Sequence, residues 1–249
     1  KEEKNTIWEL AKLNEISEII MYSLFAGITI LLGGLLARVF EKWCGKTIES
    51  YILHWSVAFG GGILIAAVAF VLTPHAIEIF SIPQFTIIFA AGALIFFFFD
   101  KRLEKKGGVL AQTMAMLMDF IPEAIALGAT LIHDHKLGIL LAFFIGLQNL
   151  PESFNAYFDL RKSNYSPKNI LRVFFALSFL GIFSAIVGRY FLINHANLTQ
   201  GIMLFSGGGI LYLIFQDIAP LSKIKNHWEP ALGAIFGFLI GMIGIKLLG

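Results

Sequence analysis

The stretch DFIPEAIALG, Asp119–Gly128, decides the fold, because it places two carboxylates and a proline inside a long apolar run. MAMLM (Met114–Met118) precedes it and ATLI (Ala129–Ile132) follows it. Acidic side chains in such surroundings require either a soluble core with a buried acidic pair or a membrane span that holds a cation. The composition of the whole chain separates these two alternatives.

The chain has too few charged residues to cover a water-facing surface. They make up 14% of its 249 residues, whereas a soluble domain carries about 25%; the mean hydropathy is +0.76. Apolar runs recur that are long enough to cross about 30 Å of hydrocarbon. We expect an all-α polytopic protein of the cell (inner or plasma) membrane, with eight transmembrane helices near 17–40, 55–79, 83–100, 108–132, 137–160, 168–192, 199–221 and 229–249.

Lys and Arg are unevenly distributed between the two sides of these predicted spans. Thirteen lie on one side and six on the other. Positively charged loops stay on the cytoplasmic side, so the pattern predicts that both termini face outside. The polar N-terminal segment has no signal-peptide pattern and is expected to form a short external helix over residues 1–16. The single Cys44 excludes an internal disulfide and a cysteine-rich metal centre.

Two glycine motifs recur in opposite orientations. AFGGGIL (Ala58–Leu64) opens the second predicted span, FSGGGIL (Phe205–Leu211) lies early in the seventh, and each is followed by a proline, Pro74 or Pro220. Such a pair is what an inverted repeat of spans 1–3 and 6–8 requires. Close helix packing is the alternative reading of each motif alone. The pattern predicts one transmembrane domain over 1–249 in a 3+2+3 arrangement, with spans 1–3 in 17–100, a central pair in 108–160 and spans 6–8 in 168–249.

The central pair carries one polar frame twice. DFIPEA (Asp119–Ala124) and QNLPES (Gln148–Ser153) each place a polar residue three positions before Pro-Glu. Residues four apart share a helix face, and each proline removes a backbone donor, which is expected to open the helix locally. If the two helices pack side by side, three carboxylates and one amide converge: Asp119, Glu123, Gln148 and Glu152.

Carboxylates at this depth need a compensating cation. One charged residue at a helix centre costs about 2.5–3.5 kcal/mol, and three unpaired carboxylates would largely take up protons. No Lys or Arg lies at matching depth in the predicted spans, and all six histidines fall at or beyond span ends. A divalent metal bound by oxygens satisfies the requirement. Protonated structural carboxylates and a proton relay without metal remain as alternatives.

These motifs resemble those of the ZIP (Zrt-, Irt-like protein) family of divalent metal transporters. QNLPES matches the family's fifth-span polar pair and x-Pro-Glu-Gly, with Ser153 in place of Gly. YLIFQDIAPLS resembles the seventh span, where an acidic residue, here Asp217, precedes a proline. The resemblance implies eight spans, external termini, a 3+2+3 inverted arrangement, and elevator-like uptake of zinc.

The fourth span departs from the family pattern. The family's His falls on Asp119 and its Asn on Phe120, while Pro122 and Glu123 are kept, and Leu177–Gly188 contains no acid for a second metal. An all-oxygen site favours manganese or iron over the zinc that the resemblance implies. We therefore expect a single metal site at Asp119, Glu123, Gln148 and Glu152, with Asn149 peripheral.

Further polar residues lie on both sides of this predicted site. Candidates for the outer access are His75, His133, Asp134 and His135, and candidates for the inner exit are Asp159 and Asp217. Ordinary turn and interfacial residues are the alternative in both cases.

Together these patterns predict a transporter of zinc, manganese or iron, with cadmium or cobalt as further substrates. We expect no enzymatic activity, no resident cofactor and no nucleic-acid partner, with the lipid bilayer as surroundings and a homodimer as a candidate assembly. A transport-inactive metal sensor and an intramembrane metal-dependent hydrolase are the rival functions.

Overall fold

The computed structural model describes residues 2–43, 46–106, 108–225 and 227–248, and over these residues the chain is all-helical. Side chains are described for residues 13–43, 50–103, 105, 116–225 and 227–248. The α-helices are α1 (Glu2–Trp43), α2 (Lys46–Ala67), α3 (Pro74–Ile79), α4 (Ile82–Lys106), α5 (Gly108–His133), α6 (His135–Lys162), α7 (Pro167–Leu192), α8 (Ala196–Leu213), α9 (Ala219–Leu221) and α10 (Glu229–Leu248). Two π-helical segments, η1 (Val68–Leu72) and η2 (Ile214–Ile218), continue α2 and α8.

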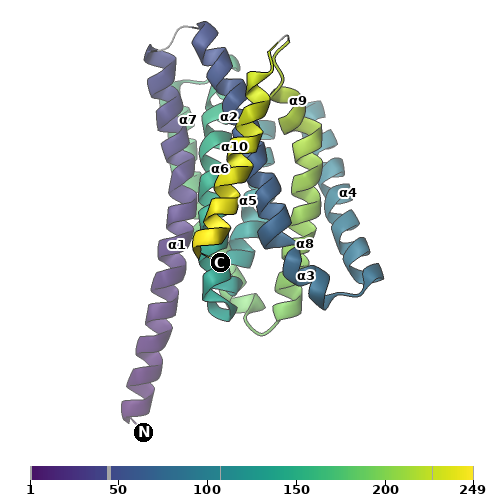
Figure 1. The fold of residues 1–249 in the computed structure, drawn as a ribbon. Coiled ribbons are helices and arrows are strands. Elements are labelled where there is room, and N and C mark those ends of the chain that lie inside the picture. The colour runs from purple at the N-terminus through teal and green to yellow at the C-terminus, as the bar shows by residue number, and fades with distance from the viewer. Residues whose placement is uncertain (1, 44–45, 107, 226, 249) are drawn as a thin grey trace.

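Eight helical segments of the described chain are long and apolar enough to cross a membrane, which confirms the predicted multi-pass membrane class. They are Leu13–Trp43, Ser50–Ile79, Ile82–Leu103, Met116–His133, His135–Lys162, Pro167–Leu192, Ala196–Leu221 and Glu229–Leu248. The second span joins α2, η1 and α3, and the seventh joins α8, η2 and α9. Both chain ends lie toward the same end of the bundle (Figure 1).

The segment expected to form a short external helix over residues 1–16 is helical but continuous with the first span. Residues Glu2–Trp43 form one helix of 42 residues, so the polar segment continues directly into the first span (Figure 1). The sequence explains this continuity, because no proline or glycine precedes Gly27 and nothing else interrupts helix formation. Lys1 lies outside the described residues.

The helices pack in two groups of four. One group contains α1, α5, α6 and α7, which contact one another extensively. In the other group, α2 packs against α10 and α8 packs against α4. The two groups meet chiefly where α2 contacts α6 and where α8 contacts α5. The central pair α5 and α6 therefore lies at the junction of the groups (Figure 1).

Glycines bring the backbones of the second group into direct contact. In each of its two main helix pairs, a glycine of either helix lies against a backbone carbonyl of the other: Gly62 and Gly237 for α2 and α10, and Gly208 and Gly92 for α8 and α4. A Cβ at any of these positions would overlap that carbonyl oxygen. Two members of the glycine clusters, Gly62 and Gly208, therefore permit close helix packing, as in other membrane bundles.

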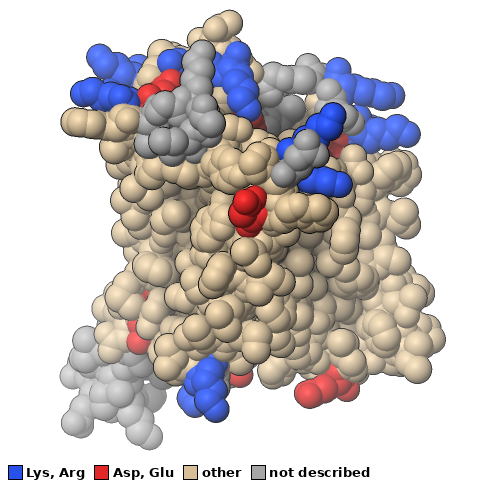
Figure 2. All heavy atoms as spheres, turned by 45° about the horizontal axis from the view of Figure 1, so that its top comes forward, with Lys and Arg blue, Asp and Glu red and all other residues tan. Residues whose placement is uncertain are grey.

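The charges divide the surface of the bundle into an apolar belt and polar ends. Lys and Arg gather at the end where α1 finishes and α2 begins (Figures 1 and 2). Lys42 lies in the last turn of α1, and Arg161 and Lys162 lie in the last turn of α6. We call this the basic end of the bundle.

The glycine contact gives a direct test of the packing. Gly62→Ala should destabilise the protein by about 1–3 kcal/mol, the usual cost of overpacking, because its new methyl group meets the backbone of α10 rather than a flexible side chain. Gly201→Ala is the matched control, since a Cβ added at Gly201 would lie 3.8 Å from its nearest neighbour, the Phe80 ring. Thermal unfolding in detergent measures both variants, and equal melting temperatures would contradict this packing.

Candidate metal site

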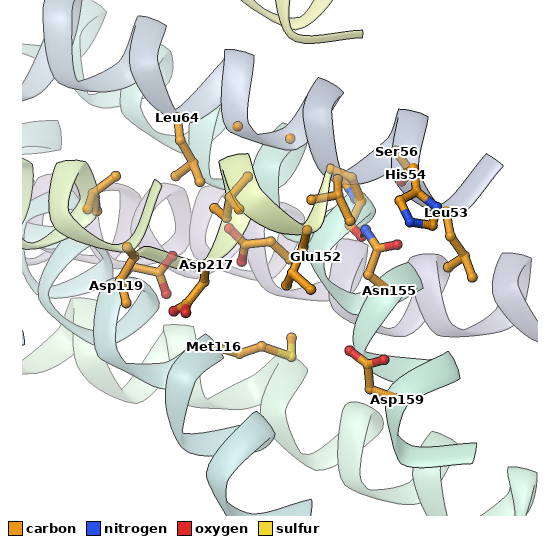
Figure 3. A pocket seen from close by; sticks show the side chains of 18 of the residues that line it. Leu53, His54, Ser56, Leu64, Met116, Asp119, Glu152, Asn155, Asp159 and Asp217 are labelled. Carbon is orange, nitrogen blue, oxygen red and sulfur yellow. Dashed lines mark hydrogen bonds between the residues drawn. The ribbon is translucent and has the colours of Figure 1, made fainter. Parts of the chain in front are cut away.

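Asp119 of α5 and Glu152 of α6 line one cavity of about 370 Å³ that extends toward the basic end. Its walls come from α2, α4, α5, α6 and the α8–η2–α9 segment. Figure 3 shows Asp119, Glu152 and Asp217 around one part of this cavity, with His54 and Asp159 farther along it. The cavity thus connects carboxylates in the membrane-spanning core with the mouth of the bundle.

Glu123 and Gln148 lie behind the cavity wall. Their exposed fractions are 1% and 0%, and Gln148 Nε2 donates a hydrogen bond to Glu123 Oε2 at 2.6 Å. This bond joins α5 to α6, so the structure brings these two predicted ligands together. The predicted quartet is consequently divided into an occluded pair, Glu123 and Gln148, and a cavity-facing pair, Asp119 and Glu152.

Three buried oxygens of the quartet have no hydrogen-bond partner. They are Glu123 Oε1, Gln148 Oε1 and Glu152 Oε2. Leaving a buried acceptor without a partner costs about 1–3 kcal/mol, and more for a charged group. None of the ion pairs in the described part of the chain includes Asp119, Glu123 or Glu152. The site thus has more hydrogen-bond acceptors than donors, and a cation can bind the acceptors that remain.

The four predicted ligands do not form a closed coordination sphere in this structure. Within the described residues, no three His, Cys, Asp or Glu side chains are grouped so that they could hold a metal ion together. Asp119 Oδ1 instead accepts a hydrogen bond from the backbone N–H of Phe120 at 2.8 Å. Binding a cation to all four side chains therefore requires them to move closer.

Both prolines lie inside helices that remain continuous. Pro122 is internal to α5 and Pro151 to α6, so the expected opening does not interrupt either helix. A proline removes one backbone donor, and packing from neighbouring helices supports the rest of the turn. At Pro151 this support comes from α2, where even a Cβ on Gly60 would lie 3.1 Å from the proline ring.

Phe120 follows Asp119 in the first polar frame, and Asn149 follows Gln148 in the second. Both contact other helices of the same group. Phe120 is buried, and its ring lies so close to α7 that a Cβ on Gly181 would crowd it at 2.7 Å. Asn149 Nδ2 donates to the carbonyl oxygen of Ala26 in α1 at 2.9 Å. Asn149, predicted as a peripheral ligand, thus ties α6 to α1 and does not line the cavity.

The outer candidates lie away from this cavity. His75 and His133 are exposed, Asp134 caps α6 by accepting from Leu137 N at 3.0 Å, and His135 Nε2 lies 3.1 Å from Glu18 Oε2. None of the four lines the cavity. Asp134 thus caps its own helix and His135 contacts α1, and neither is joined to the carboxylates.

Both inner candidates line the cavity, together with residues that sequence reasoning missed. Asp159 accepts from Lys162 Nζ at 2.9 Å, and Asp217 belongs to η2. The missed residues are His54, Asp100 and Asn155. His54 was placed beyond a span end, yet the second span begins at Ser50. The spacing of Glu152, Asn155 and Asp159 on one helix face is the signal that could have identified Asn155.

Oxygen donors of this kind suit hard and borderline divalent cations. The described donors around the junction of α5 and α6 comprise carboxylates and amides, with a histidine only nearer the mouth. A scan against protein-family models and a search of curated proteins found no match for the chain. Function is therefore inferred from the donor set, its burial and the cavity.

Access to the cavity can be measured by thiol labelling in a Cys44→Ser background. Ser56→Cys should react with a membrane-impermeant reagent applied to the basic end, because Ser56 lines the cavity. Ser153→Cys is the matched control and should stay protected, because Ser153 is fully buried and bonded to Asn149 O at 2.7 Å. Equal labelling at both positions would contradict the assigned cavity.

Proposed function

We propose that the chain transports divalent metal cations toward the cytoplasm, with a single cation site between α5 and α6. The observation that carries this proposal is the set of buried oxygens without partners on Glu123, Gln148 and Glu152. A cation supplies the missing interaction, and no described Lys or Arg does so. The resemblance to ZIP transporters suggests zinc, whereas the oxygen donors favour manganese or iron.

A single site is supported by the packing around α5. Phe120 takes the position at which the family carries a coordinating Asn, and its ring lies against Gly181. An aromatic ring there fills space that a second metal and its ligands would need. The Asn149 side chain is likewise hydrogen-bonded to the backbone of α1. One cation at the site between α5 and α6 is therefore the occupancy that we propose.

The cavity and the charge distribution support the proposed direction of transport. The cavity is lined near its mouth by His54 and Lys162, at the basic end. The positive-inside rule makes that end cytoplasmic, with both termini outside. A site that water reaches from the cytoplasmic side, with the outer candidates outside the cavity lining, corresponds to an inward-facing state.

The helix packing supports the proposed 3+2+3 inverted repeat. Span 2 pairs with span 8 as span 7 pairs with span 3, through reciprocal glycine contacts. Each glycine motif is followed by a π-helical segment and then a proline. Transporters of this kind alternate access by moving one bundle against another. We propose that α1 and α7 move together with α5 and α6, as their mutual packing favours.

Uptake into proteoliposomes tests the site. Glu123→Ala and Glu152→Ala should each reduce metal uptake to the background of empty vesicles, because each removes a charged ligand. Glu78→Ala is the control, since Glu78 is exposed on α3 and away from the cavity. Uptake that stays unchanged in both site variants would refute the assignment, and metal binding without flux in the native chain would favour a sensor.

The choice of metal is tested by competition among Mn²⁺, Fe²⁺, Zn²⁺, Cd²⁺ and Co²⁺ for uptake. The oxygen donors predict that Mn²⁺ and Fe²⁺ compete at least as well as Zn²⁺. Asp119→His introduces an imidazole and should shift the preference toward zinc by about tenfold, which corresponds to roughly 1.4 kcal/mol. A native protein that transports zinc alone would refute the hard-ion preference.

A further inference from the structure

A row of polar side chains follows α6 from the carboxylates to the cavity mouth. Glu152, Asn155 and Asp159 are spaced three and four residues apart, so they share one helix face. All three line the cavity. At 1.5 Å per residue, Asn155 lies about 4.5 Å and Asp159 about 10.5 Å beyond Glu152 along the helix. The row therefore continues the cation path after the central site.

The side chain of Asn155 is held with its oxygen available. Its Nδ2 donates to the carbonyl oxygen of Pro151 at 2.7 Å. Because a carbonyl can only accept, the amide nitrogen must face it, and Oδ1 is directed elsewhere. Oδ1 is buried and has no partner. Asn155 thus presents a neutral oxygen ligand whose orientation is fixed by the backbone.

A backbone carbonyl also orients His54 of α2. Its Nδ1 lies 2.6 Å from the carbonyl oxygen of Ser50, so Nδ1 carries the proton and the neutral ring keeps its lone pair on Nε2. Histidines that bind metals commonly donate their other ring N–H to a backbone carbonyl in this way. His54 also lines the cavity.

These residues lie within about 6 Å of one another along the axes of α2 and α6. The two helices run antiparallel and approach each other at Gly60 and Pro151. Measured from that contact toward the mouth, Asn155 lies about 6 Å, His54 about 9 Å and Asp159 about 12 Å along the helices. Figure 3 shows His54 beside Asn155, with Asp159 farther along α6.

We propose that His54 Nε2, Asn155 Oδ1 and the Asp159 carboxylate form a second cation site, through which the metal leaves the protein. Its direction of use rests on the proposed function. The mixed nitrogen and oxygen donors suit borderline cations such as Co²⁺ and Zn²⁺, and water from the cavity completes the coordination. Lys162, which holds Asp159 at 2.9 Å, gives way when a cation binds.

Co²⁺ titration of the purified full-length chain in detergent tests this site. The native protein and Glu123→Gln should both show a Co²⁺-binding component that His54→Gln weakens by about tenfold, in the range typical for a lost metal-site interaction. His195→Gln is the matched control, because His195 is exposed and lies outside the cavity lining, and it should bind like the native chain. Identical isotherms for the two histidine variants would overturn the proposal.

A gain of affinity excludes misfolding as the explanation. Asn155→Asp replaces the Nδ2 donor to Pro151 O with a second, charged oxygen, which a bound cation attracts, and should tighten the His54-dependent component by about tenfold, roughly 1.4 kcal/mol. Weaker or unchanged binding in this variant would count against Asn155 as a ligand. The experiments distinguish failure of this proposal from failure of the proposed function. Normal transport by Glu123→Gln and Glu152→Gln would refute the central site. A change in Co²⁺ binding confined to the His54 and Asn155 variants concerns the second site alone.

Discussion

The burial of carboxylates without an internal counter-charge is the constraint on which the rest of this structure depends. Asp119, Glu123 and Glu152 lie in membrane-spanning helices, and none of the described ion pairs includes them. Glu123 gains one strong hydrogen bond from Gln148, yet each glutamate keeps a buried oxygen without a partner. Charges in such a setting are costly, so their presence supports the proposed cation, which the chain itself does not supply.

The positions of these carboxylates connect the fold to the proposed mechanism. They lie on α5 and α6, at the junction between the two packed groups of helices. Within the groups, glycines allow backbone contact and give extensive packing. Between the groups, the cavity lies beside the contact of α2 with α6 and is lined by α2, α4, η2, α5 and α6. A site placed at this junction changes its accessibility whenever one group moves relative to the other.

The sequence predicted the eight spans because continuous apolar runs of this length have few other stable structures. It also predicted the approach of Glu123 to Gln148, since paired Pro-Glu frames place both residues on facing helices. A helix was predicted in the N-terminal segment, but not its continuation into the first span, which the absence of proline and glycine before Gly27 permits. The contribution of His54 was missed because hydropathy locates a span end only to within a turn, and one turn decides whether a side chain reaches the cavity. The split of the quartet depends on the packing of α2 and α8 around α5 and α6, which local sequence does not encode.

The most direct test of the central claim is X-ray absorption spectroscopy of the full-length chain loaded with one equivalent of Mn²⁺. The account predicts an ion held by oxygen ligands alone, and the loss of this all-oxygen coordination in Glu123→Gln and in Glu152→Gln. No bound ion in the native chain, or an ion whose binding is unaffected by both substitutions, would contradict it.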